Sequence, residues 1–178
     1  RSHGGFFEKL NADGSPADLP RRARVLGRQI YVFSRAPELG WTGPAADIVN
    51  HGLATLPAFL RADGMAQYRL DANGQPLDDR PDLYDQAFVL FGLAHALPLA
   101  GDADAVIRIA ETMRQALEDL RAHPVAGYEE DSPPSWPLKA NPHMHLLEAA
   151  LAWATALPTE DAGDWRDMAD RIARLALD

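Results

Sequence analysis

The sequence predicts an all-α protein built from pairs of helices, and two observations carry this prediction. Apolar residues recur mostly at helical spacing over long stretches of the chain. Short turn-rich segments separate these stretches, and two of them match, LNADGSP at 10–16 and LDANGQP at 70–76. Repeating units bury their apolar faces on their neighbours. Two helices per unit therefore predict an α/α toroid with an inner and an outer layer, in which inner helices present polar residues to a central cavity.

Six helices are expected from the apolar spacing. They cover residues 20–35, 44–62, 82–101 and 102–123, a segment that begins at 141, and residues 161–177. Pro57 should kink or end the second helix, because proline lacks the backbone N–H that continues a helix. Asp82 suits the N-cap of the third helix. Asn141 suits the N-cap of the fifth, with Pro142 at the first helical position.

The two matching turn segments each predict a β-hairpin between helices. Leu70 begins the second segment 60 residues after Leu10 begins the first. Asp-Gly or Asn-Gly between strand-like residues is typical of a tight hairpin turn. GYEED, beginning at Gly127, reads as a degenerate third copy. The predicted unit is thus a hairpin followed by two helices, and the alternative is coincidental turn chemistry in an ordinary helical domain.

Composition and charge exclude several classes of function. The chain has 178 residues, a formal net charge of -9 and no cysteine. An acidic chain argues against a nucleic-acid surface, and no apolar run is long enough to indicate a membrane span. The absence of cysteine excludes disulfides, thiolate catalysis and cysteine-ligated metals, and it fits a cytoplasmic protein. A homo-oligomer is compatible with the sequence.

The stretch NPHMHLLEA holds two histidines, which helical geometry separates. A residue advances about 100° around a helix, so His143 and His145 point about 200° apart and cannot share one task. Asn141, His145 and Glu148 instead form one polar face. Histidine is suited to removing a proton next to a carbonyl. The alternatives are a hydrogen-bonded core histidine, or a metal site, for which the spacing of the two histidines fits a strand better than a helix.

Arg28 lies within an otherwise apolar helical stretch. A buried arginine there needs an acceptor, either a carboxylate that ties two helices together or an oxygen of a substrate. Three nearby arginines are expected to be solvated: Arg21, Arg22 and Arg24.

DLYDQAF places three polar residues at the front of the third helix, Tyr84, Asp85 and Gln86. They are expected to line the same end of the cavity as Asn141. The alternative is that they serve only as caps and surface contacts.

Four stretches taken together resemble the N-acylglucosamine 2-epimerase family: HGGFFEKLNADGSP, RVLGRQIYVFSRA, DLYDQAFVLFGLA and NPHMHLLEA. The resemblance implies an (α/α)6 barrel and sugar isomerisation or epimerisation without metal or other cofactor. It also implies that Arg28 is the active-site arginine and His145 one of two catalytic histidines. Asn141 and Tyr84 resemble substrate-contacting positions, whereas Glu148 has no firm match.

The expected reaction is aldose–ketose isomerisation of mannose or mannose 6-phosphate to the fructose form through an enediolate. The alternatives are a 2-epimerase of N-acylglucosamine or a related sugar, an (α/α)6 glycan hydrolase, and a non-catalytic helical-repeat fragment. The family's barrel is roughly twice this length, and the chain ends at Asp178 within a helical pattern. Residues 1–178 are therefore expected to be a partial barrel domain that lacks the second catalytic residue and is inactive alone.

Overall fold

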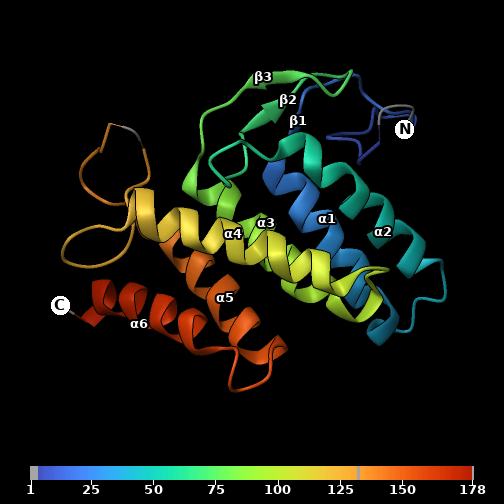
Figure 1. Cartoon of the computed structure of the whole chain (residues 1–178). Helices are drawn as coiled ribbons and strands as arrows, with labels where there is room; N and C mark the ends of the chain where they lie inside the picture. The colour runs from blue at the N-terminus through green and yellow to red at the C-terminus, as the bar shows by residue number, and fades with distance from the viewer. Residues whose placement is uncertain (1–3, 132, 178) are drawn as a thin grey trace.

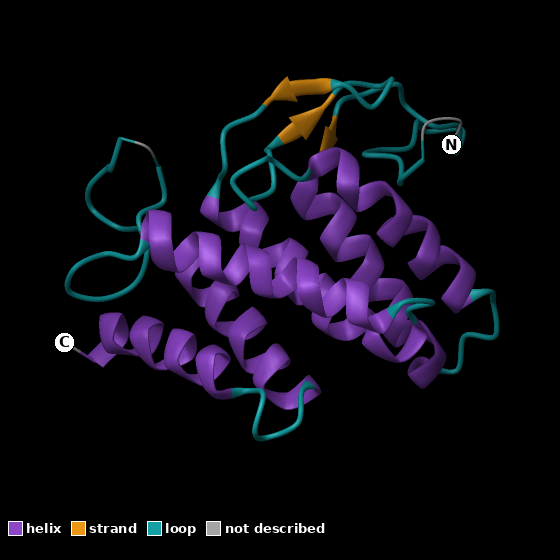
Figure 2. Ribbon diagram, in the orientation of Figure 1, coloured by secondary structure: helices purple, strands orange, loops and turns teal. Residues whose placement is uncertain are grey.

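The computed structural model describes residues 4–131 and 133–177, and within them the chain is mainly helical (Figures 1 and 2). The six α-helices of this part of the chain are α1 (Ala23–Arg35), α2 (Ala45–Thr55), α3 (Leu83–Ala96), α4 (Ala103–Arg121), α5 (Ala140–Ala156) and α6 (Gly163–Leu177). Three short 3-10 helices extend α1, α2 and α3: η1 (Ala36–Leu39), η2 (Leu56–Phe59) and η3 (Leu97–Leu99). The prediction of an all-α protein is confirmed.

The helices form two layers. The inner layer is α1, α3 and α5, which pack side by side with α3 in the middle. Helix α2 covers α1, α4 contacts α3, and α6 covers α5 (Figure 1). Helices α1, α3 and α5 run in the same direction. Residues near their N-terminal ends line one hollow, and residues near their C-terminal ends line another. This is the predicted layering of helix pairs. None of the helices that the structure describes is long and apolar enough to cross a membrane.

Two glycines let α1 and α3 approach at backbone distance. A Cβ atom added to Gly27 would lie 2.1 Å from the carbonyl oxygen of Phe88, and one added to Gly92 would lie 2.4 Å from that of Gly27. Both distances are far below van der Waals contact, so only glycine fits. On the other side of α3, the indole of Trp153 in α5 donates to the carbonyl of Leu90 at 2.9 Å. The inner helices therefore have one fixed alignment.

Three short strands form an antiparallel sheet at the N-terminal end of the inner helices. They are β1 (Arg21–Arg22), β2 (Arg69–Leu70) and β3 (Pro76–Asp78), in the order β1-β2-β3. The hairpin predicted at 70–76 is confirmed as β2–β3, with Gly74 at φ 87° in its turn. The segment at 10–16 keeps only one bridge, between Leu10 and Pro16.

The predicted third hairpin copy at Gly127 is wrong in its register. The bridge found there pairs Ala122 with Tyr128, and it corresponds to a bridge between Leu60 and Ala66. The sequence analysis did not single out LRADGMA at 60–66, although it shares Leu, Ala, Asp and Gly with LNADGSP at matching positions.

Some helix boundaries differ from the prediction. Helix α1 begins three residues after Pro20, because residues 21–22 pair with β2. The break near Pro57 is confirmed, since α2 ends at Thr55 and a 3-10 turn follows. The Asp82 cap is also confirmed, because its side chain accepts from the backbone N–H groups of Tyr84 and Asp85.

The predicted cap of α5 is wrong. Lys139, not Asn141, is the N-cap residue of α5, and it makes no side-chain cap. Its backbone N–H instead donates to the carboxylate of Glu130, a residue of the preceding loop. An acceptor brought by tertiary structure therefore shifts the start of the helix to Ala140.

Candidate active site

Arg28 on α1 and Tyr84 on α3 meet between two helices of the inner layer. Arg28 is exposed, and its Nη2 donates to the Tyr84 hydroxyl at 2.7 Å. Its guanidinium carbon lies 4.0 Å from the centroid of the Phe88 ring. This planar cation is held by a hydrogen bond and by an aromatic face, an arrangement that lysine cannot reproduce. The alternative of an Arg28–carboxylate pair between helices is not what the structure shows for the described residues.

His145 on α5 joins the same cluster. Its imidazole centroid lies 5.3 Å from that of Tyr84 and 4.6 Å from that of Phe88. Its Nδ1 lies 2.7 Å from Oε2 of Glu148, one turn further along α5. Three inner helices thus bring Arg28, Tyr84 and His145 together, as the sequence analysis expected of these residues.

His143 faces the other way, as helical geometry predicts. It is only 4% exposed. Its Nδ1 lies 2.8 Å from the carbonyl oxygen of Lys139, and its Nε2 lies 3.1 Å from the backbone nitrogen of Tyr128. His143 therefore fastens α5 to the loop before it, and the two neighbouring histidines have different surroundings.

A hollow of about 340 Å³ opens at the N-terminal end of the inner helices. Tyr84 and Asn141 both line it, which places these two predicted substrate contacts at one site. Arg24 also lines the hollow, together with Lys139 and Glu130, which form an ion pair at 2.8 Å. The wall therefore carries hydrogen-bonding groups of both charges, suited to a polar ligand rich in hydroxyl groups.

Arg24 was expected to be solvated, but the structure shows that it has protein partners. It pairs with Asp85, whose carboxylate is fully buried, at 3.3 Å, and Asp85 also accepts the backbone N–H of Arg24 at 2.7 Å. Arg24 further donates to the Tyr68 hydroxyl at 3.1 Å. Burial raises the pKa of Asp85 to about 7, although the charge of Arg24 opposes the change. Asp85 thus holds the start of α1 against α3.

The predictions for three other polar residues near the N-terminal end of the inner helices, Gln86, Arg21 and Arg22, are wrong. Gln86 is buried and does not line the cavity: its amide bonds both the N–H and the carbonyl of Ala66 at 2.7 Å. Arg21 is only 4% exposed and donates to the carbonyl of Gly4 at 2.6 Å. Arg22 forms an ion pair with Glu8. Each arginine expected in solvent has a partner supplied by a segment distant in sequence.

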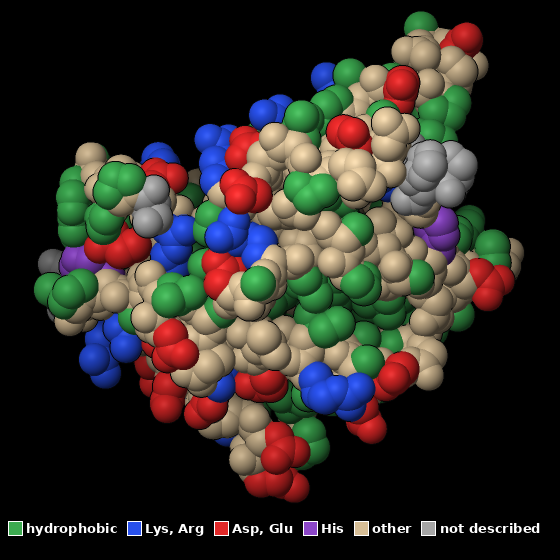
Figure 3. Space-filling model, turned by 45° about the horizontal axis from the view of Figure 1, so that its top comes forward, with side chains coloured by type: hydrophobic (Ala, Val, Ile, Leu, Met, Phe, Trp, Pro, Cys, Tyr) green, Lys and Arg blue, Asp and Glu red, His purple; other side chains and the backbone are tan. Residues whose placement is uncertain are grey.

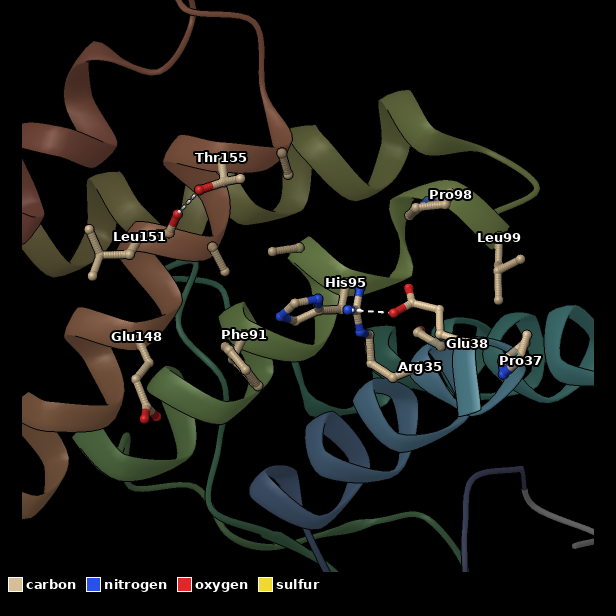
Figure 4. A pocket seen from close by; sticks show the side chains of 14 residues that line it. Arg35, Pro37, Glu38, Phe91, His95, Pro98, Leu99, Glu148, Leu151 and Thr155 are labelled. Carbon is tan, nitrogen blue, oxygen red and sulfur yellow. Dashed lines mark hydrogen bonds and ion pairs between the residues drawn. The ribbon is translucent and has the colours of Figure 1, made fainter. Parts of the chain in front are cut away.

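A second, larger hollow of about 750 Å³ lies at the C-terminal end of the inner helices (Figure 4). Its wall is mostly apolar, with Phe91 and His95 between Glu148 on one side and the ion pair of Arg35 and Glu38 on the other. Burial lowers the pKa of His95, and the nearby charge of Arg35 lowers it further. Arg28 and His145 are in the lining of neither hollow: Tyr84, their neighbour, lines the smaller one, and Glu148, the partner of His145, lines the larger one. The candidate site is placed at the cluster of Arg28, Tyr84 and His145, which connects the two linings.

No group of three or more histidine, aspartate or glutamate side chains that could hold a metal ion is found among residues 4–131 and 133–177. On the face shown in Figure 3, acidic and basic side chains are interspersed.

The sequence analysis did not predict the contacts of Phe88 and Arg24 in the site region, nor that Asp85 pairs with Arg24. The helical spacing i, i+4 from Tyr84 and from Arg28 would have pointed to the first two.

Comparison with known proteins identifies the family. A family model described as N-acylglucosamine 2-epimerase (GlcNAc 2-epimerase) matches residues 5–178. The chain belongs to the N-acylglucosamine 2-epimerase family. Its sequence is 38% identical over 177 residues to a mannose-6-phosphate isomerase of Rhizobium meliloti (strain 1021), covering 98% of this chain and 46% of that protein. It is 33% identical over 177 residues to a D-mannose isomerase of Thermobifida fusca, covering 90% of this chain and 41% of that protein.

Solved structures of the family share the fold. A cellobiose 2-epimerase from Spirochaeta thermophila superposes with a TM-score of 0.80 at 23% identity, covering 96% of this chain and 46% of that one. The chain therefore has the architecture of about half of the family's (α/α)6 toroid and spans less than half the length of the relatives it matches. The curated relatives that this chain matches are named as isomerases and epimerases of sugars.

Proposed function

We propose that the complete protein interconverts mannose, free or as its 6-phosphate, and the corresponding fructose form. The observation that carries this proposal is the convergence of Arg28, Tyr84 and His145 from three helices on one open face. A base, a fixed cation and a hydroxyl group are what proton transfer next to a carbonyl requires. The likeness to the mannose-6-phosphate isomerase of R. meliloti, at 38% identity, supports the choice of sugar.

The proposed chemistry begins with the open-chain aldose. His145 takes the proton from carbon 2, the C–H electron pair forms the C1–C2 double bond of an enediolate, and negative charge develops on the carbonyl oxygen. The Arg28 guanidinium stabilises this charge. The hydroxyl proton on carbon 2 passes to the oxygen on carbon 1 as a carbonyl forms at carbon 2, and His145 returns a proton to carbon 1, which gives the ketose.

In this proposal residues 1–178 are part of one barrel domain, and the second acid–base residue lies outside them. The protein is placed in the cytoplasm, in keeping with its lack of cysteine. No metal takes part, because Arg28 supplies the charge for the oxygen and the carboxylate nearest His145 is engaged with the imidazole. The chain alone is expected to be inactive.

A 2-epimerase is the second candidate, because it would use the same base and the same enediolate. It would return the proton to carbon 2 from the opposite face. A glycan hydrolase would need a pair of carboxyl groups flanking the sugar bond. In the described site Asp85 is buried against Arg24 and Glu148 is bonded to His145, so this alternative has less support.

The test supplies mannose, and separately mannose 6-phosphate, to the full-length gene product in the presence of EDTA. Formation of fructose or fructose 6-phosphate is expected, and the preferred substrate decides the phosphorylation state. Glucose as the first product from mannose would indicate the epimerase instead. No conversion of either sugar, or activity lost on chelation, would contradict the proposal.

A further inference from the structure

The contact between His145 and Glu148 has a chemical consequence beyond the family assignment. Nδ1 of His145 lies 2.7 Å from Oε2 of Glu148. An ionised carboxylate can only accept a hydrogen bond, so the proton of a neutral imidazole must then sit on Nδ1. The other ring nitrogen, Nε2, is left with its lone pair and can accept a proton.

The ring is also restrained from turning. Tyr84 and Phe88 flank it with centroids 5.3 Å and 4.6 Å away, and the imidazole is only 19% exposed. Rotation about the Cβ–Cγ bond would remove Nδ1 from Glu148 and move the ring against these aromatic faces. The Glu148 carboxylate and the rings of Tyr84 and Phe88 therefore favour the same orientation of the imidazole.

We propose that Glu148 is a positioning residue that holds His145 in its Nδ1–H tautomer and thereby makes Nε2 the proton acceptor. The proposal rests on the proposed function for its catalytic meaning, but the tautomer itself does not. An orienting carboxylate on the far nitrogen of a catalytic histidine fixes both tautomer and ring orientation.

The alternative is a surface ion pair with no further role. Glu148 is 52% exposed, and its spacing from His145 is the ordinary i, i+3 of helix pairs. Such a pair would leave the tautomer free to exchange and turnover unchanged when broken. The two possibilities therefore differ in what a spectrum and a rate would show.

The first test is spectroscopic and needs no substrate. The ring nitrogens of ¹⁵N-histidine-labelled chain are recorded by long-range ¹H–¹⁵N correlation at a pH where His145 is neutral, for the wild type, E148Q and the control E160Q. Glu160 is an exposed carboxylate in the turn after α5. We expect the Nδ1–H pattern for His145 in the wild type and in E160Q, and a mixture of both tautomers in E148Q. His143 should keep its signals in all three. A wild-type Nε2–H pattern, or no change in E148Q, would overturn the proposal.

The second test is kinetic and uses the full-length gene product. Loss of a carboxylate that orients a metal-bound histidine costs about 10–100-fold in affinity or activity, and we expect the same order for His145. We expect kcat to fall by this factor in E148Q and E148A with KM little changed, and E160Q to match the wild type. Unchanged kcat in both Glu148 variants would overturn the positioning role. If the wild type itself lacks isomerase and epimerase activity, the proposed function fails while the tautomer result still stands.

Discussion

Arg28 and Tyr84 are 56 residues apart in the chain, yet Nη2 of Arg28 donates to the Tyr84 hydroxyl at 2.7 Å. This bond joins α1 to α3 on the face that bears His145. The Phe88 ring contacts both the Arg28 guanidinium, 4.0 Å from its centroid, and the His145 imidazole, whose centroid is 4.6 Å away, so the cation and the imidazole share an aromatic neighbour.

Replacing Arg28 should damage turnover more than stability. Arg28 is exposed, and exposed substitutions usually change the free energy of unfolding by less than about 0.5 kcal/mol. Loss of a donor that stabilises a developing oxyanion costs about 10²–10³-fold in kcat. R28K keeps the charge but loses the planar contact with Phe88, so it should be impaired nearly as much as R28A. The control R35K, at the larger hollow, should retain activity; an active R28A would contradict the assigned role.

The two neighbouring histidines should give opposite phenotypes. H145Q should lower activity about 10²–10⁴-fold, the usual contribution of a positioned acid–base group, with little change in stability. H143Q should lower the free energy of unfolding by about 1–3 kcal/mol, because buried partners in the backbone lose their hydrogen bonds. Urea unfolding and steady-state rates on both variants provide the comparison. If H143Q and H145Q changed the free energy of unfolding and the rate equally, the two histidines would not have the different roles assigned to them.

The glycine contact between α1 and α3 should not tolerate a methyl group. G27A places its Cβ 2.1 Å from the Phe88 carbonyl oxygen, so the helices must separate. Overpacking of this kind costs about 1–3 kcal/mol or more. G163A is a matched control, because a Cβ there meets nothing within 4 Å. A G27A variant with the urea midpoint of the wild type would contradict the tight approach.

Stability should depend on pH through Asp85. An aspartate in the unfolded chain has a pKa of about 3.9, whereas burial raises the pKa of Asp85 in the folded chain to about 7. The folded state therefore binds the proton more tightly, and this stabilisation, complete below about pH 4, is lost as pH rises to about 7. Between pH 4.5 and 7.5 the free energy of unfolding should fall more steeply in the wild type than in D85N. Parallel curves for the two proteins would refute this assignment.

The sequence predicted those parts of the structure that depend on local spacing. The opposite orientation of His143 and His145, the Asp82 cap and the break at Pro57 all follow from rules that act within a few residues. The grouping of Arg28, Tyr84 and His145 was predicted by family resemblance, and it depends physically on the close approach at Gly27, which spacing alone does not reveal.

The errors concern partners that are distant in sequence. The sequence analysis predicts Arg24 in solvent, because its partner Asp85 is 61 residues away. Only the packing of α1 on α3 brings the two residues into contact. Asn141 was expected to cap α5, but Glu130 supplied an acceptor to Lys139 and moved the boundary. A chain offers many carboxylates to each cation and N–H group, and packing decides which one is used.

The most direct measurement is incorporation of solvent deuterium at carbon 2 of mannose by the full-length gene product, in D₂O with EDTA, compared with H145Q. If His145 moves the carbon-bound proton, recovered mannose acquires deuterium at carbon 2 in the wild type, together with fructose formation, and H145Q loses both. An H145Q variant that forms fructose and exchanges deuterium as fast as the wild type would contradict proton transfer by His145.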